Sequence, residues 1–372
     1  MTSALVIGGG IVGLVAARAL ALRGVRVTLL ERKPVIEDEA GIGIGLQNNA
    51  LNALGEIGLA QAIVDGGVPV GLIHVYAPTG HRLGTRPTER YCGSLWPGYA
   101  GISRASLHAI LVAGARDAGA ELVTGAEVER LEERPDGVSV TLAGGGELTA
   151  DMVVGCDGIY STLRRQLFPE HAQPQPTGEA VWRGLVPGVD LDDISFVFGG
   201  PVGTIGYCAL RGDVYLYAVD RDDRPPPRDA PDMAERMQAL LAGAKGPPVE
   251  LAARISRVPG DVTYRRLETV QLPAPWHRGR VILIGDAAHA GPPTLAQGAA
   301  MGIEDAVVLA QCVAAADKTD EAFAAFMARR HERVRTIVEA SITIARAQME
   351  PDGQAQVAAA GARAAAVLAE PY

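Results

Sequence analysis

The chain has 372 residues, of which 48% are hydrophobic and 21% are charged, and its formal net charge is -9. This composition excludes a disordered chain, a collagen-like repeat and a disulfide scaffold, and the length fits about two globular domains. The acidic balance argues against nucleic acid as a partner, because nucleic-acid binding needs a concentrated cationic surface.

The four cysteines are far apart in the sequence and form no C-x-x-C pair, which argues against a zinc site or a dithiol redox pair. We therefore expect free thiols, no bound metal and a cytoplasmic location. The first apolar run, Ala4–Ile7, meets Gly8 at once and has no basic segment before it. We therefore expect neither a signal peptide nor a membrane span, and no membrane partner.

The N-terminal segment predicts a βαβ unit. The apolar run Ala4–Ile7 precedes a Gly-rich turn, apolar residues recur at helical spacing over Ile11–Leu22, and Val25–Leu30 is a β-branched run. Strand, Gly-rich turn, helix and strand in this order are typical of a nucleotide-binding α/β domain.

The turn in this unit carries the pattern Gly8-x-Gly10-x-x-Gly13. The first glycine permits a tight turn, the second lets a pyrophosphate approach the backbone, and the third lets the helix pack closely. Glu31 stands at the end of the next strand, where a carboxylate can accept from a ribose 2′-hydroxyl. This favours FAD or NAD over NADP, and we place the neighbouring Arg32 in the same cofactor site.

Helices and a buried strand follow in the next part of the chain. We expect helices over Leu46–Leu59 and Ser103–Gly119, the second capped by the Ser103 hydroxyl. Glu121–Leu131 is predicted as a strand, and Met152–Val154 as a buried strand that ends at Asp157 and its glycine.

Composition then shifts toward short apolar runs separated by Gly and Pro. Residues 177–220 lack long helical periods and predict an antiparallel sheet. Val281–Ile284 is again a buried strand and leads into Gly285 and Asp286, and helices are expected from about Gly298 to the end. The basic run 329–335 is interpreted as a solvated helix face.

Two aspartates carry chemistry after buried strands, and each has an alternative structural role. Asp157 could serve only as a turn residue, and Asp286 only as a helix cap. In the functional interpretation, Asp286 accepts from a polyol chain, while the backbone after Pro292 faces a flavin. Pro293 and Gly298 belong to that segment, where small residues suit a ligand that lies against the backbone.

Together these segments resemble the class A FAD-dependent monooxygenases, the para-hydroxybenzoate hydroxylase-like aromatic hydroxylases. The resemblance rests on the glycine turn with Glu31, on the segment from Cys156 to Arg164, and on Gly285 with Asp286. The segment around Arg104 also looks like the family segment whose arginine lies along the FAD pyrophosphate. The match spans most of the chain.

The resemblance implies a Rossmann-like FAD-binding domain, interrupted by a β-sheet-rich substrate domain and followed by C-terminal helices. The expected ranges are 1–70, 100–175 and 265–315 for the FAD-binding domain, 71–99 and 176–264 for the substrate domain, and 316–372 for the C-terminal helices.

The implied activity is hydroxylation of a small aromatic or heteroaromatic compound with NADH or NADPH and O₂, through a flavin C4a-hydroperoxide. Epoxidation or Baeyer–Villiger oxygenation, and a non-catalytic flavin-binding accessory role, stay open as alternatives. The expected assembly is a monomer or a homodimer.

The sequence departs from the family pattern in the loop expected beside the flavin. Many members have P-x-x-G-Q-G there, whereas this chain has Ala296 at the first of these glycines. An added methyl group could tighten the loop or alter the mobility of the flavin.

Three side chains are candidates for catalysis. Tyr207 and Tyr215 resemble residues that family members place over the flavin ring, and Tyr207 could hydrogen-bond a phenolic substrate. Each tyrosine could equally be a packed residue with a satisfied hydroxyl. His289 lies next to the flavin motif, and its alternative is a histidine satisfied by backbone groups. Arg183 is mostly structural in this interpretation, although it could face a carboxylate substrate.

Overall fold

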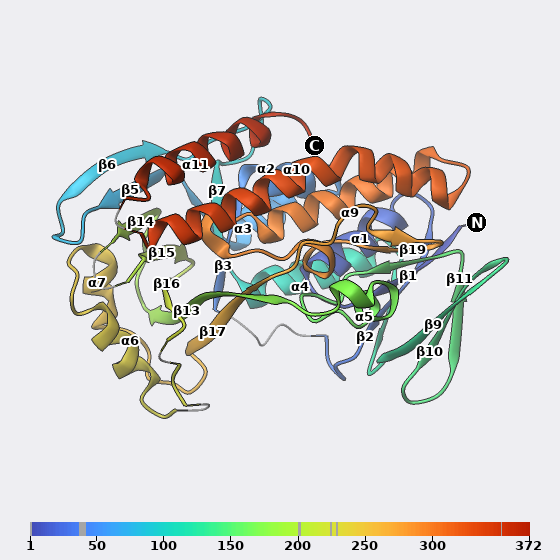
Figure 1. Cartoon of the computed structure of the whole chain (residues 1–372), viewed down its shortest axis with the longest axis horizontal. Coiled ribbons are helices and arrows are strands. Elements are labelled where there is room, and N and C mark those ends of the chain that lie inside the picture. The colour runs from blue at the N-terminus through green and yellow to red at the C-terminus, as the bar shows by residue number, and fades with distance from the viewer. Residues whose placement is uncertain (1, 37–41, 200–201, 224, 228–229, 351) are drawn as a thin grey trace.

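The computed structural model describes residues 2–36, 42–199, 202–223, 225–227, 230–350 and 352–372 (Figure 1). Over these residues the chain forms a mixed α/β structure with a six-stranded sheet, a seven-stranded sheet, two three-stranded sheets and a set of long C-terminal helices.

The six-stranded sheet is mainly parallel. Its spatial order is β18 (His277–Arg278), β19 (Val281–Leu283), β12 (Met152–Gly155), β1 (Ser3–Ile7), β2 (Arg26–Glu31) and β8 (Glu121–Thr124). All neighbours from β19 to β8 pair in parallel, and only β18 is antiparallel among these pairs. Helices α1 (Ile11–Ala21), α4 (Arg104–Asp117) and α9 (Gly298–Ala315) pack together beside the sheet, which explains why β1 is buried along its whole length.

The strand order of this sheet creates a crevice. From β1 the chain moves to β2 on one side, and later returns to β12 on the other side. Helices that leave two adjacent parallel strands in opposite directions open a space at the carboxyl ends of the strands, where α/β proteins bind ligands. The predicted buried strands at Ala4–Ile7, Met152–Val154 and Val281–Ile284 are confirmed as neighbours here.

The seven-stranded sheet is mainly antiparallel, as predicted for residues 177–220. Its order is β17 (Val262–Thr269), β13 (Gln175–Pro187), β16 (Asp213–Arg221), β15 (Thr204–Leu210), β14 (Asp193–Phe198), β5 (Leu72–Tyr76) and β6 (Arg82–Pro87). One pair, β14 with β5, is parallel. Helices α6 (Met233–Leu241) and α7 (Pro247–Ala252) cover one face of this sheet and share a hydrophobic cluster with it.

A small sheet lies against the other face of the seven-stranded sheet. It contains β3 (Gly43–Gln47), β7 (Tyr99–Ser103) and β4 (Val68–Val70), and it leads into α2 (Asn48–Glu56) and α3 (Ala60–Gly66). Contact is close because glycines face the larger sheet: a Cβ built on Gly101 would lie 2.0 Å from the Ala209 carbonyl oxygen. The remaining strands, β9 (Val128–Arg134), β10 (Gly137–Leu142) and β11 (Glu147–Ala150), form the antiparallel sheet at the right of Figure 1.

Three helices complete the described chain. Helix α9 packs beside the long α10 (Thr319–Gln348), which in turn packs against α11 (Gln354–Ala369), and Figure 1 shows them lying across the top of the molecule. By length and composition α9 could cross a membrane, with a mean hydropathy of 1.4, but 67% of it is buried inside the molecule. It therefore serves here as a core helix.

Two local predictions have clear outcomes. The Ser103 cap is confirmed, since the Ser103 hydroxyl accepts from the Ser106 backbone N–H at 3.0 Å. The single strand predicted over Glu121–Leu131 is wrong. The structure ends β8 at Thr124 and turns at Gly125 with φ +67°, a left-handed conformation that glycine adopts without steric cost, before β9 begins.

Candidate functional site

Four of the predicted cofactor-site segments meet at one edge of the six-stranded sheet. Gly8 follows β1, Glu31 ends β2, Asp157 follows β12 and Asp286 follows β19. Backbone hydrogen bonds continue past the strands at this edge: the Gly8 N–H donates to the Leu30 carbonyl at 2.8 Å, Cys156 to Ile7 at 2.8 Å, and Ile284 to Gly155 at 3.0 Å. The four segments therefore form one continuous rim around the crevice.

The glycine turn divides into packing positions and an open position. Gly8 has φ +107°, and a Cβ there would lie 2.6 Å from the Cys156 carbonyl oxygen. A Cβ on Gly13 would lie 1.9 Å from the Gly8 carbonyl oxygen. Around Gly10, at the N-terminus of α1, no described atom lies within 4 Å of such a Cβ. The turn is thus a cradle that faces open space, as binding of a pyrophosphate at a helix N-terminus requires.

Glu31 supports this turn and keeps acceptor capacity. One carboxylate oxygen accepts from the Gly9 N–H at 2.7 Å, and the other accepts from the Lys33 N–H at 2.9 Å. Each carboxylate oxygen can accept more than one hydrogen bond, so a ribose hydroxyl could still bind. Arg32 is exposed beside it.

Asp157 has one satisfied and one unsatisfied carboxylate oxygen. Its Oδ2 accepts from the backbone N–H groups of Thr162 at 2.7 Å and Leu163 at 3.2 Å, at the start of α5 (Thr162–Leu167). Its Oδ1 is buried and has no hydrogen-bond partner among the described residues. Buried acceptors are nearly always satisfied in folded proteins, so this atom indicates a donor from a bound group. Together with the open cradle at Gly10, it fits a dinucleotide.

Arg164 ties two of the rim segments together. Its buried guanidinium donates to the Ala287 carbonyl at 2.9 Å and to the His171 carbonyl at 3.1 Å. The first of these bonds joins α5 to α8 (Asp286–His289). Arg164 is therefore a structural residue inside the protein.

Asp286 and Arg104 face the same recess. The Asp286 side chain is accessible, although the segments packed around it bury the carboxyl enough to raise its pKa. His289 and Arg104 act in the opposite direction and lower the pKa of the Asp286 carboxyl. An accessible group crowded by protein lies in a concave site, and Arg104, the first residue of α4, contributes positive charge to it.

The loop expected beside the flavin lies directly before α9. It comprises the short 3₁₀ helix η2 (Pro293–Leu295), Ala296 and Gln297, and then Gly298 opens α9. Pro293 and Gly298 are both exposed, and a Cβ on Gly298 would meet no described atom within 4 Å. Ala296 adopts the left-handed conformation, with φ 53° and ψ 29°.

Ala296→Gly should therefore raise the free energy of unfolding by up to about 1 kcal/mol, because an L-residue in the left-handed region costs roughly 1–2 kcal/mol and glycine does not. The matched control is Ala325→Gly, which lies on the exposed face inside α10 and should cost about 1 kcal/mol. Urea unfolding measures both variants. Equal destabilisation by the two changes would contradict the assigned backbone strain.

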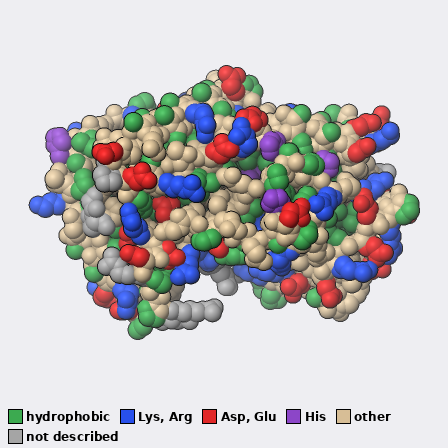
Figure 2. All heavy atoms as spheres, in the orientation of Figure 1, with side chains coloured by type: hydrophobic (Ala, Val, Ile, Leu, Met, Phe, Trp, Pro, Cys, Tyr) green, Lys and Arg blue, Asp and Glu red, His purple; other side chains and the backbone are tan. Residues whose placement is uncertain are grey.

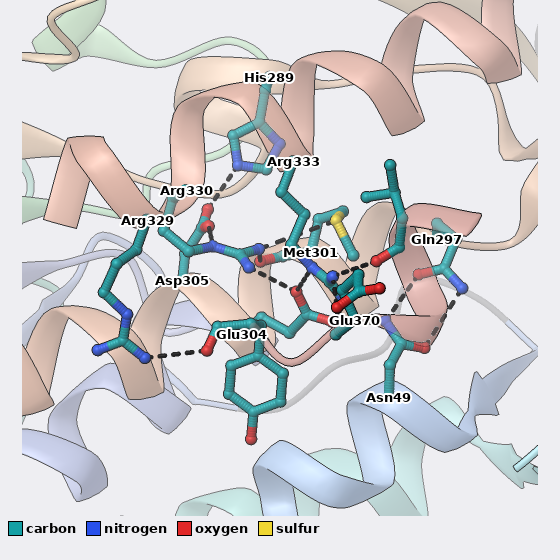
Figure 3. Close-up of polar contacts among 12 residues, drawn as sticks. Asn49, His289, Gln297, Met301, Glu304, Asp305, Arg329, Arg330, Arg333 and Glu370 are labelled. Carbon is teal, nitrogen blue, oxygen red and sulfur yellow. Dashed lines mark hydrogen bonds and ion pairs between the residues drawn. The ribbon is translucent and has the colours of Figure 1, made fainter. Parts of the chain in front are cut away.

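Amide side chains hold this loop against the start of α2. The Gln47 Nε2 donates to the Leu295 carbonyl at 2.6 Å, and the Gln297 Nε2 donates to Gln47 Oε1 at 2.7 Å. Asn49 Nδ2 donates to Gln297 Oε1 at 2.9 Å and to Glu304 Oε1 at 2.7 Å (Figure 3). The loop therefore cannot move without breaking buried hydrogen bonds.

A buried ionic network extends from this clasp to α10. Arg330 donates to Asp305 Oδ1 at 2.8 Å and to Glu304 Oε2 at 2.6 Å, and Arg333 donates to the same Glu304 oxygen at 2.8 Å. Figure 3 shows the two arginines of α10 reaching toward the two acids of α9. Four charged side chains thus fix the helix that begins at Gly298. The interpretation of 329–335 as a solvated face is wrong for Arg330 and Arg333, which are buried.

His289 belongs to this network. Its Nε2 lies 2.5 Å from Asp305 Oδ2, and its ring packs against Trp276 with 5.0 Å between centroids. Burial would raise the pKa of the Asp305 carboxyl, but His289 and Arg330 bring this pKa below its ordinary value. The structure places His289 inside the protein, behind Asp286, and does not bring it to the tyrosines.

Tyr207 and Tyr215 lie on opposite faces of the seven-stranded sheet. In the register of β15 with β16, Tyr215 pairs with Cys208, whereas Tyr207 pairs with Leu216. The Tyr207 ring is buried in the cluster under α6 and α7, and its hydroxyl is 2.8 Å from both Asp193 carboxylate oxygens. The structure therefore does not bring Tyr207 together with Tyr215.

The face that carries Tyr215 is lined with aromatic side chains. Tyr215 and Tyr217 have ring centroids 5.5 Å apart, and Phe196 lies 6.4 Å from Tyr217. Tyr99 enters from β7, with its hydroxyl 3.7 Å from the Cys208 sulfur. These rings are only half-buried, yet the protein around them raises the pKa of all three tyrosine hydroxyls. This face of the seven-stranded sheet lies against β3 and β7 of the small sheet, which partly enclose the rings.

Some residues of the site escaped the sequence analysis. Three of these residues act through contacts between segments far apart in the chain, and no sequence motif indicates them: Gln47, Asn49 and Tyr99. Glu304 and Asp305 lie on the apolar helix α9. Two adjacent acids on an apolar helix were the available signal, because carboxylates are almost never fully buried without cationic partners.

Comparison with known protein families gives a match over most of the chain. Residues 1–341 match a family model described as FAD binding domain. This range contains all four rim segments, the flavin loop and the tyrosine-bearing sheet.

Relatives and solved structures agree with this match. The chain is 31% identical over 345 residues to the aurachin C monooxygenase/isomerase of Stigmatella aurantiaca, covering 91% of this chain and 88% of that protein. It is 33% identical over 348 residues to the 2-heptyl-3-hydroxy-4(1H)-quinolone synthase of Pseudomonas aeruginosa, covering 92% and 88%. A solved structure of 2-methyl-3-hydroxypyridine-5-carboxylic acid oxygenase is 26% identical with a TM-score of 0.79, covering 98% and 96%.

Proposed function

Because the chain belongs to the FAD-binding family that includes these monooxygenases, we propose that it uses NADH or NADPH and O₂ to hydroxylate a small aromatic or heteroaromatic compound. The protein is an FAD-dependent monooxygenase. FAD, when bound, supplies the chemistry by which a reduced cofactor activates O₂, and the protein contributes binding, orientation and exclusion of water.

One observation supports this function more than any other. The strand order of the six-stranded sheet brings the open cradle at Gly10, the unsatisfied Oδ1 of Asp157 and the accessible Asp286 to one rim. We assign the pyrophosphate to the cradle and to Arg104, the ribose to Glu31, and the polyol chain to Asp286. Arg32 lies beside the ribose in this assignment, and the backbone from Pro293 to Gly298 faces the ring.

The substrate belongs on the aromatic face of the seven-stranded sheet. Tyr215 and Tyr217 offer hydroxyl groups and ring surfaces there, and the glycines of β3 let that face approach the cofactor segment closely. Burial raises the pKa of the Tyr215 hydroxyl, so this group stays protonated near neutral pH and can donate a hydrogen bond. We propose Tyr215 as the substrate-contacting tyrosine, and we assign Tyr207 and His289 to packing.

We propose domain limits in which the substrate domain contains the smaller hydrophobic cluster. Residues 1–70, 100–175 and 265–315 form the FAD-binding domain, 71–99 and 176–264 form the substrate domain, and 316–372 form the C-terminal helices. The buried residues of the smaller cluster, from Trp182 to Val262, all fall within 176–264. A cytoplasmic monomer or homodimer fits a surface on which acidic and basic side chains are interspersed, as the face in Figure 2 shows.

The direct test starts from the visible spectrum of the purified protein. We expect a yellow protein whose NADH or NADPH oxidation in air accelerates with one compound from a panel of phenols and heteroaromatic acids. Hydroxylated product should form in step with the oxidation. A yellow protein that no compound stimulates would support the accessory role. An epoxide or a lactone as product would support the alternative oxygenations.

Asp286→Ala should weaken FAD binding by about ten- to a hundredfold, the equivalent of one lost hydrogen bond to a charged group of about 1.5–3 kcal/mol. The measurement is a titration of the apoprotein with FAD, followed by flavin fluorescence. Asp320→Ala, at the exposed start of α10, is the control and should bind FAD like the parent. If the Asp286→Ala variant binds FAD as tightly as the parent does, the assignment of the polyol chain to Asp286 is wrong.

A further inference from the structure

His108 is a buried histidine that contacts the glycine turn. It lies on α4, one helical turn after Arg104, and only 5% of its surface is exposed. Its Nε2 is 2.9 Å from the carbonyl oxygen of Gly9, a residue 99 positions earlier in the chain. A carbonyl oxygen can only accept a hydrogen bond, so Nε2 carries a proton and donates it. The imidazole therefore ties α4 to the turn that precedes α1.

Side chains from two different elements bind both polar groups of the Gly9 backbone. The Gly9 N–H donates to Glu31 Oε2 at 2.7 Å, and the Gly9 carbonyl accepts from His108. Gly9 is buried, whereas Gly10 is exposed. The peptide group that joins these two glycines therefore runs from the interior to the open side of the turn, and its oxygen atom is held at the inner end.

The bond from His108 fixes the direction of the Gly10 N–H. In a planar trans peptide, the carbonyl of one residue and the N–H of the next point in opposite directions. Because the Gly9 oxygen is held in the interior, the Gly10 N–H points outward, and it has no hydrogen-bond partner among the described residues. Rotation of this peptide by half a turn would present the carbonyl oxygen to the ligand instead, and that oxygen would repel a phosphate.

We propose that His108 is a positioning residue for the cofactor, because it holds the Gly9–Gly10 peptide in the orientation that presents the Gly10 N–H to the pyrophosphate of FAD. This rests on the proposed function, in which the cradle at Gly10 receives the pyrophosphate. Arg104 and His108 are four residues apart on α4 and share one face of the helix. Arg104 adds positive charge at the ligand, whereas His108 acts through the turn. A histidine that only completes the packing of α4 would affect folding stability without a preference for ligands that carry a pyrophosphate.

The experiment measures the binding of FAD, ADP and adenosine to the full-length apoprotein. FAD binding is followed by flavin fluorescence, and the other two ligands are measured by their displacement of FAD. ADP carries a pyrophosphate and adenosine does not, so the ratio of their dissociation constants isolates the pyrophosphate contact. We expect the parent to bind ADP at least tenfold more tightly than adenosine. His108→Leu should bind FAD ten- to a hundredfold more weakly than the parent and lose most of the preference for ADP, with its affinity for adenosine unchanged.

His108→Gln should restore most of the affinity for FAD, because the amide nitrogen of glutamine reaches about as far as the imidazole Nε2 and donates a hydrogen bond. His108→Asn has a shorter side chain and should not restore it. These two variants keep a polar group at this position, so they test the inference even where the leucine variant does not fold. Val112→Ala is the matched control. Val112 is buried on the next turn of α4, so this change should lower the midpoint of urea unfolding and leave the preference for ADP intact.

Four results would overturn the inference: a parent that binds adenosine as tightly as ADP, a full preference for ADP in His108→Leu, an equal loss of affinity for ADP and adenosine in that variant, or equal affinity for FAD in His108→Gln and His108→Asn. The proposed function fails separately. A protein that shows the expected preference for ADP, but whose NADH or NADPH oxidation no aromatic compound stimulates, would contradict hydroxylation and leave the role of His108 in place.

Discussion

Arg330→Met should lower the free energy of unfolding by about 3–5 kcal/mol, the loss expected when one partner is removed from a buried ion pair. Arg330 is fully buried and bonds both Glu304 and Asp305, which are also fully buried. Methionine keeps much of the side-chain volume, so the change removes charge and hydrogen bonds rather than packing. What remains is two buried carboxylates whose basic side-chain partners among the described residues are then Arg333 and His289.

Arg330→Met should also weaken the binding of FAD. Asp305 Oδ2 accepts from the Gly285 N–H at 3.1 Å, and Glu304 holds Asn49, which holds Gln297 of the flavin loop. Both segments that we assign to the flavin site therefore depend on acids that Arg330 balances. We expect the variant to be purified with less FAD than the parent, as measured from the ratio of flavin to protein absorbance.

Arg335→Met is the matched control for this change. Arg335 lies on the same helix and also pairs with two glutamates, Glu332 and Glu339, but it is exposed. Exposed pairs are screened by water and contribute little, so the midpoint of urea unfolding should stay close to that of the parent. An equal decrease in the free energy of unfolding in the two variants would show that burial does not determine how strongly the network stabilises the protein.

The rim that we propose as the cofactor site could be predicted as a structural feature because its geometry follows from local rules. Each of Gly8, Asp157 and Asp286 lies within three residues of the end of a short buried strand, and parallel strands place their carboxyl ends at one edge of the sheet. A motif that follows such a strand can therefore be placed in the fold from the sequence alone. The same logic gave the start of α4, since the Ser103 cap acts within three residues.

Local rules do not determine whether Tyr207 lies on the same face of the sheet as Tyr215. Alternation along one strand correctly puts Tyr215 and Tyr217 on one face. Whether Tyr207 shares that face depends on the register between β15 and β16, and a shift of one residue reverses it. The register pairs Cys208 with Tyr215, so Tyr207 points under α6 and α7. No pattern within either strand determines this.

The buried network of Glu304, Asp305, Arg330 and Arg333 likewise depends on contacts that no local sequence pattern determines. Helical spacing predicts that Arg330 and Arg333 share a face, but not that this face meets Glu304 and Asp305. A basic run on an amphipathic helix ordinarily faces water, and here the pairing between α9 and α10 reverses the outcome for two of its residues. Long-range contacts between helices are therefore the part of this site that the sequence left open.

Two substitutions in the glycine turn should separate effects on folding stability from effects on cofactor binding. Gly13→Ala should destabilise the protein by about 2–3 kcal/mol or more, because the new methyl group would stand 1.9 Å from the Gly8 carbonyl oxygen, a backbone atom that cannot rotate away. The helix α1 must then move off β1, and the variant should be isolated without FAD. Urea unfolding and the visible spectrum measure the two effects.

Gly10→Ala should behave in the opposite way. Its methyl group meets no described atom within 4 Å, and its φ of -77° suits any residue, so the apoprotein should lose at most about 1 kcal/mol at this N-cap position. The same methyl group enters the space assigned to the pyrophosphate, and FAD should bind at least tenfold more weakly on titration of the apoprotein. Parent affinity for FAD in Gly10→Ala would place the pyrophosphate away from this turn. A large loss of stability in the same variant would mean that the space above Gly10 is filled by the protein itself, and the cradle would then be a packing feature rather than a binding site.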